Sequence, residues 1–352
     1  MDETARRLVM RYGWNATAYQ VLNKGIEHWF SEAGDGLVGF VRHKHVRVVA
    51  GAPIGPRERL PGIVAEWEEA SSEAGERVCY FGAADRLREA VGLHPGSSIV
   101  LLGAQPSWDP ARWHETVHAY PSLRAQFKRA SNKNVVVREW SSEKATDHPE
   151  LLRCLAEWLE TRGLPPLHFL VEPETLHEVG DRRIFVAEKD GEAVGFVSMA
   201  PVPARNGWLT EQFVRGFDAP NGTIELMLDT AIEAVAFSGA DYVTMGLVPL
   251  ADHGLQARVT HPWWLRILLP WVRAHGRRFY NFDGLDAFKS KFRPHAWEPL
   301  YAIANEPVFS PRTLYAITEA FTARPPLVAV GLGLLRAARQ EIRWAFHPRR
   351  PR

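Results

Sequence analysis

Residues 208–250 constrain the fold of this chain more than any other stretch. Residues 208–215 alternate along the chain as a strand with one buried face does. Apolar residues then recur at helical spacing over 224–235, and a short apolar run follows at 242–247. This pattern predicts a strand, a loop, a helix and a second strand. On the first strand, the alternation would place four side chains on one face: Leu209, Glu211, Phe213 and Arg215.

The loop before the predicted helix is the first candidate site. Asn221 or Thr223 can cap the helix after the break at Pro220 and Gly222, and Gly239 can end it. Unpaired N–H groups and the positive end of the helix dipole favour an anion or a developing oxyanion at such a point. We therefore interpret Asn221, Gly222 and Thr223 as candidate catalytic residues. The alternative is a tight turn with a cap, because Pro-Asn-Gly is a weak motif.

The first half of the chain repeats this order of elements. Apolar runs at 37–41 and 46–50 predict a hairpin, and a glycine-containing loop, a helix to about residue 71 and a strand at 77–81 follow. In the second half, a hairpin over 184–200 precedes the unit described above. We predict an α/β (α+β) fold with two copies of one mixed lobe. The expected divisions are residues 1–140 with a basic connecting helix, residues 141–305, and a basic helical C-terminal tail at 306–352.

Size and composition limit the class of protein. A chain of 352 residues suggests two domains, and a net charge of +1 argues against a surface that is basic all over. With Cys79 and Cys154 as its only cysteines, the sequence argues against a disulfide framework or a cysteine zinc site and fits a reducing compartment. No signal peptide and no apolar run of ~18 residues are present. We expect neither a metal nor a cofactor.

Two groups of cations could bind phosphates. Arg124 and Lys128 lie on a basic helix predicted within 121–134, where they could grip a nucleic acid or a lipid. A solvated helix between the lobes is the alternative. Lys289, Lys291 and Arg293 lie among many aromatic residues, which favours a phosphate clamp with a shaped floor over solvent-facing charges.

Two segments could lie at a membrane surface. Residues 261–273 are apolar nearly all round and carry three Trp, which is typical of a helix that is deeply buried or lies on a bilayer. The tail combines an apolar run at 325–335 with six arginines against Glu341, which suits an anionic membrane. A disordered or partner-bound tail is the alternative.

Several segments resemble a known family. They are 218–225 (DAPNGTIE), 246–250 (GLVPL), 280–285 (YNFDGL), 288–292 (FKSKF) and 297–301 (WEPLY). These motifs are similar to those of the soluble catalytic domain of bacterial phosphatidylglycerol lysyltransferases, also called multiple peptide resistance factors. The similarity covers roughly residues 15–305 and is most specific in the second lobe.

The resemblance implies a tandem pair of GNAT-type acyltransferase lobes. It also implies transfer of an amino acid from aminoacyl-tRNA to a lipid hydroxyl, that of phosphatidylglycerol in the usual case. In the family, an acidic residue precedes an arginine by three positions. Arg215 matches the arginine, but Gln212 stands at the acid position with Glu211 beside it. Either Glu211 takes the acidic role or the chemistry is altered. Lys289 and Lys291 match the family's lysines.

Roles for these residues follow as expectations. Glu211 would be a base or an orienting carboxylate, and Arg215 its partner or a phosphate ligand, although a structural ion pair between them is the alternative. Glu225 is expected to favour the helix dipole rather than to catalyse. The remaining substrate-binding residues would line the site: Tyr280, Asn281, Asp283, Lys289, Lys291, Arg293 and Trp297, with Arg124 and Lys128.

The expected location is cytoplasmic, at the inner face of the bacterial membrane. The family's usual enzymes carry a multi-span flippase domain ahead of the catalytic one, and this chain shows none, so its own surface would have to reach the lipid. Three other functions fit less well: a CoA-dependent N-acyltransferase, an aminoacyl-tRNA-dependent transferase to a cell-wall peptide, and a non-catalytic protein that binds lipid or tRNA. The loop at 218–223 lacks the usual pyrophosphate-binding pattern of the first.

Overall fold

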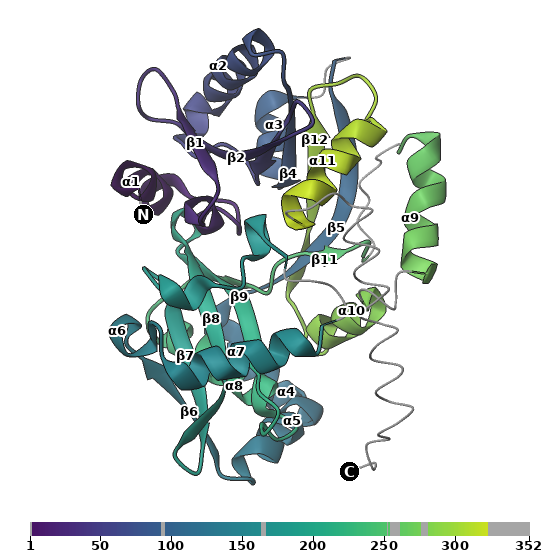
Figure 1. The fold of residues 1–352 in the computed structure, drawn as a ribbon. Helices are drawn as coiled ribbons and strands as arrows, with labels where there is room; N and C mark the ends of the chain where they lie inside the picture. The colour runs from purple at the N-terminus through teal and green to yellow at the C-terminus, as the bar shows by residue number, and fades with distance from the viewer. Residues whose placement is uncertain are drawn as a thin grey trace.

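One mixed sheet organises the chain. The computed structural model describes residues 2–92, 96–162, 167–251, 253, 261–275 and 281–322. Within these residues, twelve strands form one sheet in the order β1-β2-β3-β4-β12-β5-β10-β9-β8-β7-β6, with β11 paired to β5 beside this path. Figure 1 shows the sheet passing through an upper and a lower lobe. The predicted mixed α/β fold is confirmed, with one continuous sheet in place of a separate sheet in each lobe.

Each lobe contributes strands at one end of the sheet. The first lobe supplies β1 (Glu27–Phe30), β2 (Leu37–His43), β3 (Val46–Ala50) and β4 (Arg77–Ala83). The second lobe supplies β6 (Val135–Trp140), β7 (Arg183–Lys189), β8 (Glu192–Val202), β9 (Gly207–Arg215) and β10 (Tyr242–Thr244). The middle of the sheet contains β5 (Ser98–Trp108), β11 (Val248–Pro249) and β12 (Ala296–Ala304).

The predicted repeat is present in the strand pairing. In the first lobe β2 and β3 are antiparallel, and β3 is parallel to β4 across helix α2 (Leu60–Glu73). In the second lobe β8 and β9 are antiparallel, and β9 is parallel to β10 across helix α8 (Thr223–Phe237). A parallel pair needs a crossover of this kind, so the two helices hold equivalent places.

Helices cover both faces of the sheet in each lobe, and each face has its own buried cluster. In the first lobe, α2 and α3 (Asp85–Val91) lie on one face; α1 (Glu3–Tyr12), α9 (Trp263–His275) and α11 (Pro311–Thr322) lie on the other. In the second lobe, α4 (Trp113–Ala119), α5 (Pro121–Ser131), α8 and α10 (Phe282–Ser290) cover one face, and α6 (Ser142–Ala145) and α7 (Pro149–Glu160) the other.

Short 3-10 helices connect these elements. They are η1 (Tyr19–Leu22), η2 (Arg57–Arg59), η3 (Pro110–Arg112), η4 (Phe169–Val171), η5 (Thr175–His177) and η6 (Pro203–Arg205). The two lobes are joined by strands as well as by connections, because β12 lies between β4 and β5 and pairs with both. Of the predicted tail, α11 packs on the first-lobe core, and residues 323–352 lie outside the described residues.

Candidate functional site

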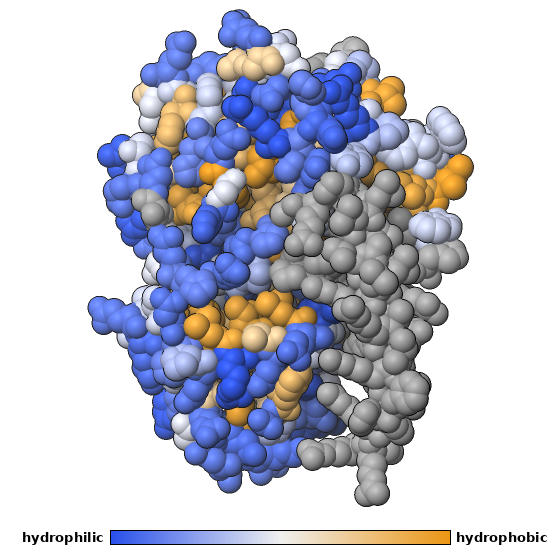
Figure 2. Space-filling model, viewed as in Figure 1, coloured by the Kyte–Doolittle hydropathy of each residue, from blue (hydrophilic) through white to orange (hydrophobic). Residues whose placement is uncertain are grey.

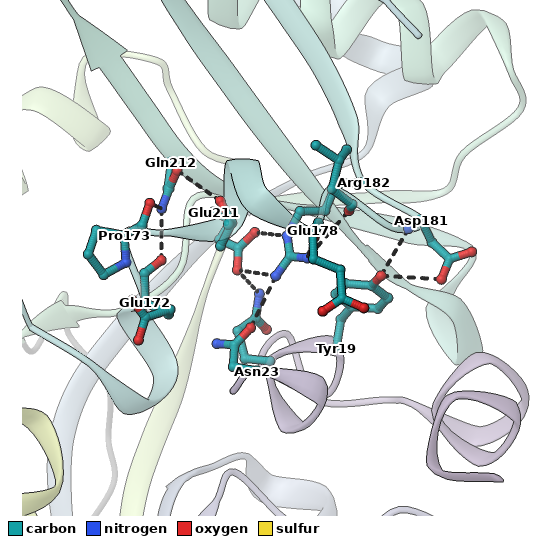
Figure 3. A network of polar contacts seen from close by, with 12 residues as sticks. Tyr19, Asn23, Glu172, Pro173, Glu178, Asp181, Arg182, Glu211 and Gln212 are labelled. Atoms are coloured by element: carbon teal, nitrogen blue, oxygen red, sulfur yellow. Dashed lines mark hydrogen bonds and ion pairs between the residues drawn. The ribbon is translucent and has the colours of Figure 1, made fainter. Parts of the chain in front are cut away.

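A β-bulge on β9 separates side chains that the alternation placed on one face. The pairing register shifts opposite Ser198 and Met199, which leaves Glu211 as the extra residue. Phe213 packs against the core under α8, whereas Glu211 points to the N-terminal segment of the first lobe (Figure 3). The predicted shared face is therefore wrong at Glu211.

The carboxylate of Glu211 is fully engaged in a buried network (Figure 3). Arg182 donates to both of its oxygens, at 2.5 and 3.1 Å, and Gln20 of η1 donates to one of them at 2.9 Å. The side chains of Glu211 and Arg182 are each 4% exposed. Arg182 also donates to Asn23 at 3.1 Å. The network therefore ties the second lobe to the segment that follows α1.

The catalytic role of Glu211 stays a prediction, and this network favours a structural role for its carboxylate. Burial alone would lower the pKa of Arg182, but the charge of Glu211 and its hydrogen bonds raise that pKa above the usual value. A proton taken up by Glu211 would leave the arginine buried without a counter-charge, which is costly. Glu211 and Arg215 also form no pair with each other, because each has a different partner.

Gln212 has a structural role that an acid could not fill. Its amide nitrogen donates to the backbone carbonyls of Glu172 and Pro173 at 2.8 and 3.2 Å. Its amide oxygen accepts from the hydroxyl of Thr175 at 3.2 Å. An ionised carboxylate has no donor for the two carbonyls. Where the family has an acid, this chain therefore has an amide that forms hydrogen bonds to the loop at 172–175 (Figure 3).

The structure does bring several predicted residues together at the N-terminal turn of α8. Arg215 donates to the side-chain oxygen of Asn221 at 3.3 Å. Lys291, from the end of α10, forms an ion pair with Glu225 at 2.6 Å and lies 4.1 Å from the centroid of the Phe288 ring. Within the described residues, no side chain caps α8. Two cations thus contact residues at or just before the first turn of a helix that has no side-chain cap.

Gly222 lets this turn lie against α5. Its φ of +97° is left-handed, and a Cβ there would lie 2.6 Å from the carbonyl oxygen of Gln126. Thr223 is buried and its hydroxyl donates to the carbonyl of Pro220 at 2.7 Å. The predicted caps are wrong, since Asn221 contacts Arg215 and Thr223 closes the preceding turn. Gly222 and Thr223 shape the turn, and Asn221 is exposed on it.

The three cations at 289–293 separate instead of forming one clamp. Lys289 is buried, and its ammonium group donates to the carbonyls of Met245, Gly246 and Leu247 at 2.5, 3.0 and 3.1 Å. Burial lowers the pKa of Lys289 to about 7, and the three carbonyls oppose that effect. The substrate-binding role of Lys289 stays a prediction, and in this structure its donors are used inside the protein.

Arg293 faces a second feature, a surface hollow of about 490 Å³. Its guanidinium lies 4.6 Å from the ring centroid of Tyr120. Trp297 also lines the hollow and stacks on His253 at 3.5 Å between centroids. The lining also includes Arg112 and one acidic residue, Glu115. Arg293 and Trp297 thus lie together, apart from the pair formed by Lys291.

Other predicted substrate ligands are engaged within the protein. Asn281 caps α10 by accepting from the backbone N–H of Gly284 at 2.9 Å. Asp283 accepts from Arg273 at 3.2 Å. Arg124 donates to the carbonyls of Val117 and His118, where α4 ends. These contacts are structural, and the binding roles of Asn281, Asp283 and Arg124 stay predictions. Lys128 is exposed on α5, and Tyr280 lies outside the described residues.

Sequence reasoning missed the partners that decide these roles. Arg182 follows η5 and had no motif to mark it. Glu225 was assigned to the helix dipole alone, although its place one turn after Gly222 brings it to Lys291. The stacking of Phe213 on Phe288, at 5.4 Å between centroids, was also missed. The available signal was the motif FKSKF, in which Lys291 is three positions after Phe288 and next to Phe292.

Neither a metal centre nor a membrane span is found in the described part of the chain. No group of three or more His, Cys, Asp or Glu side chains among those residues could hold a metal ion. Of the helices in the same ranges, none has both the length and the hydropathy needed to cross a bilayer.

Among the solved structures with a similar fold, two belong to proteins of lysylphosphatidylglycerol synthesis by their names. One is the C-terminal domain of a putative lysylphosphatidylglycerol synthetase from Agrobacterium fabrum, with a TM-score of 0.75, 22% identity, and coverage of 91% of this chain and 96% of that one. The other is L-PGS from Bacillus licheniformis, with a TM-score of 0.71, 20% identity, and coverage of 96% and 97%. At these identities the likeness defines the class of fold.

The family follows from the sequence match. The model of the family described as "Phosphatidylglycerol lysyltransferase, C-terminal" matches residues 6–304, and the chain therefore belongs to that family. A phosphatidylglycerol lysyltransferase from Bacillus subtilis is 24% identical over 319 residues, which are 87% of this chain and 35% of that protein. The chain thus spans about a third of the length of this relative.

Proposed function

We propose that this chain transfers an amino acid from aminoacyl-tRNA to a hydroxyl of a phospholipid of the phosphatidylglycerol type. The observation that carries this proposal is the family match over residues 6–304. The curated relative from Bacillus subtilis is named for lysyl transfer to phosphatidylglycerol, which makes lysine the first donor to test. The chain acts as an acyltransferase at the cytoplasmic face of the membrane, as a peripheral protein.

The acceptor site is the surface at the N-terminal turn of α8. Arg215 and Lys291 supply positive charge. Arg215 contacts Asn221 and Lys291 contacts Glu225, and a phosphate can replace either partner. Arginine and lysine are suited to phosphate by charge-assisted hydrogen bonds. We assign stabilisation of the developing oxyanion to the backbone N–H groups in the first turn of α8, which has no side-chain cap. The aromatic floor under Lys291 consists of Phe213 and Phe288.

The reaction needs no dedicated base at Glu211. The lipid hydroxyl oxygen attacks the ester carbonyl carbon and forms a new C–O bond, while the bond from that carbon to the ribose oxygen breaks. The proton of the lipid hydroxyl passes to the departing ribose oxygen, which becomes a free hydroxyl of the tRNA. Positioning of the two substrates and oxyanion stabilisation then account for the rate enhancement.

The hollow beside Arg293 suits the end of the donor RNA. Tyr120 and Trp297 offer rings on which bases can stack, and Arg112 and Arg293 offer charge to the backbone phosphates. Lys128, exposed on α5, extends the basic surface. Lys291 of the acceptor site and Arg293 of the hollow are two positions apart in the chain.

Mass spectrometry of extracted lipids tests the proposed function. We expect aminoacylated phosphatidylglycerol in bacteria that express the chain and lack such an enzyme. The double variant Arg215→Ala/Lys291→Ala should reduce the product more than about tenfold. Lys24→Ala, at an exposed position in the first lobe, is the matched control and should leave it unchanged. Acetylated products or labelled cell-wall peptides, without any aminoacyl lipid, would contradict the proposal and support the other transferase classes.

A further inference from the structure

Helix α9 has one face packed on the protein and one face in solvent. On the packed face, Leu265 is buried, and Trp264, Leu268 and Leu269 lie against the first-lobe core. The outer face is apolar as well. There, Trp263 is 74% exposed, Ile267 66% and Trp271 58%.

The outer residues form a continuous stripe. Trp263, Ile267 and Trp271 are spaced four residues apart, so they lie one above another on the same side of the helix. Because the opposite face is already anchored in the core, the exposure is not the result of a loosely packed helix. Figure 1 shows α9 projecting at the side of the molecule, and in Figure 2 the same place shows orange and pale residues at the surface. Contiguous apolar surface of this kind marks an interaction site.

The charge beside the stripe indicates what it binds. The sequence of α9 contains two arginines and neither Asp nor Glu. Arg266 is exposed and forms no ion pair with any residue in the described ranges. Arg273, seven residues on and so on the same flank, pairs with Asp283 of α10 at 3.2 Å. Tryptophan next to arginine is typical of helices that lie in the headgroup region of anionic bilayers.

A second copy of this chain fits the stripe less well. A symmetric contact between two α9 helices would bring the same surface from each subunit together. The arginines of both copies would then meet without an acidic residue of α9 to balance them. An anionic lipid surface supplies the missing negative charge and accepts the apolar side chains.

We propose that α9 is a membrane-docking helix that inserts Trp263, Ile267 and Trp271 into the headgroup boundary of an anionic bilayer while Arg266 contacts lipid phosphates. This inference rests on the proposed function, because docking serves to bring the acceptor site to its lipid. The ion pair between Arg273 and Asp283 couples α9 to α10, and α10 ends beside Lys291. Docking by one short face is reversible, and it weakens as salt increases.

Vesicle co-sedimentation of the full chain tests this docking. We expect binding to vesicles of phosphatidylglycerol and phosphatidylcholine and little binding to phosphatidylcholine alone. Trp263→Ser/Ile267→Ser should weaken binding to the anionic vesicles more than about tenfold, since it removes apolar area at the boundary. Phe237→Ser, which changes a residue 96% exposed at the end of α8, is the matched control and should bind as the wild type does. Arg266→Ala should reduce the salt dependence of binding.

The outcomes separate docking from catalysis. Equal vesicle binding by the folded double variant and the wild type would overturn the docking proposal. So would a wild-type dimer that dissociates in the double variant without any vesicle binding, as measured by sedimentation velocity. If the wild type binds vesicles but transfers no amino acid, the proposed function fails and docking stands. With both correct, the double variant loses transfer to vesicles but keeps transfer to phosphatidylglycerol in detergent micelles.

Discussion

At the scale of single residues, the partners of each charge decide which cations can hold a substrate. Lys289 and Lys291 are two positions apart, yet Lys289 donates to three backbone carbonyls inside the protein. Lys291 contacts one carboxylate and aromatic rings at a partly exposed site. A phosphate can replace Glu225 at Lys291 without loss of any backbone contact, whereas Lys289 would have to leave the core. The two lysines of one motif therefore have different roles.

The buried pair of Glu211 and Arg182 gives a stability prediction. We expect Glu211→Gln to lower the free energy of unfolding by about 3 kcal/mol, because it leaves Arg182 buried without its counter-charge. Urea unfolding followed by circular dichroism measures this. Glu192→Gln, at an exposed position of β8, should change stability by less than about 0.5 kcal/mol. A Glu211→Gln protein that is as stable as the wild type but inactive would restore Glu211 as a catalytic residue.

Lys289 predicts a dependence of stability on pH. Burial lowers its pKa from 10.5 to about 7. Between these values the unfolded chain binds a proton that the folded chain does not, so the contribution of Lys289 to stability increases as pH rises. We expect the unfolding free energy of the wild type, minus that of Lys289→Met, to increase from pH 7 to pH 9 in urea titrations. A difference that stays constant over this range would mean that the three carbonyls keep the ammonium group charged.

At the scale of elements, the site depends on how closely the start of α8 approaches α5. The crossover between β9 and β10 fixes where α8 begins, and Gly222 allows that beginning to touch the backbone of α5. The same contact places Asn221 outward, next to Arg215. A change at Gly222 should therefore affect packing and site geometry together.

Two glycines that flank α8 allow the cost of backbone strain to be separated from the cost of a steric clash. Gly222 and Gly239 both have left-handed φ, +97° and +79°, but a Cβ at Gly239 meets no atom within 4 Å. Gly239→Ala should cost about 1–2 kcal/mol, the usual penalty of that conformation. Gly222→Ala should cost about 1–3 kcal/mol more, because α5 has to move. Urea unfolding of both variants measures the difference, and equal costs would mean that the contact with α5 adapts freely.

At the scale of the whole molecule, local patterns predicted the elements but not their long-range partners. The hairpin and crossover of each lobe followed from periodicity along the chain, and so did the repeat. The insertion of β12 between β4 and β5 joins residues at least 189 positions apart, and no local pattern records that pairing. The bulge at Glu211 turns one side chain away from the face that alternation predicts, and the residue types along the strand do not signal it. Arg182 was therefore not predictable as the partner of Glu211.

The candidate site was predictable in part for the same reason. Arg215 contacts Asn221 and Lys291 contacts Glu225, because a strand end and a later helix both reach the start of α8. The motifs marked these residues by type, and the structure separates those that face the surface from those that hold the fold. Burial of Lys289 and the pairing of Asp283 depend on tertiary contacts that residue type does not determine.

The most direct test is transfer by the purified chain from tRNA charged with radiolabelled lysine to vesicles that contain phosphatidylglycerol. We predict that label appears in the extracted lipid, depends on an acceptor headgroup with a hydroxyl, and falls more than about tenfold in Arg215→Ala/Lys291→Ala but not in Lys24→Ala. No lipid label from folded wild-type protein, with lysine or with any other charged tRNA, would contradict the proposed function. Full transfer by the folded double variant would contradict the proposed site.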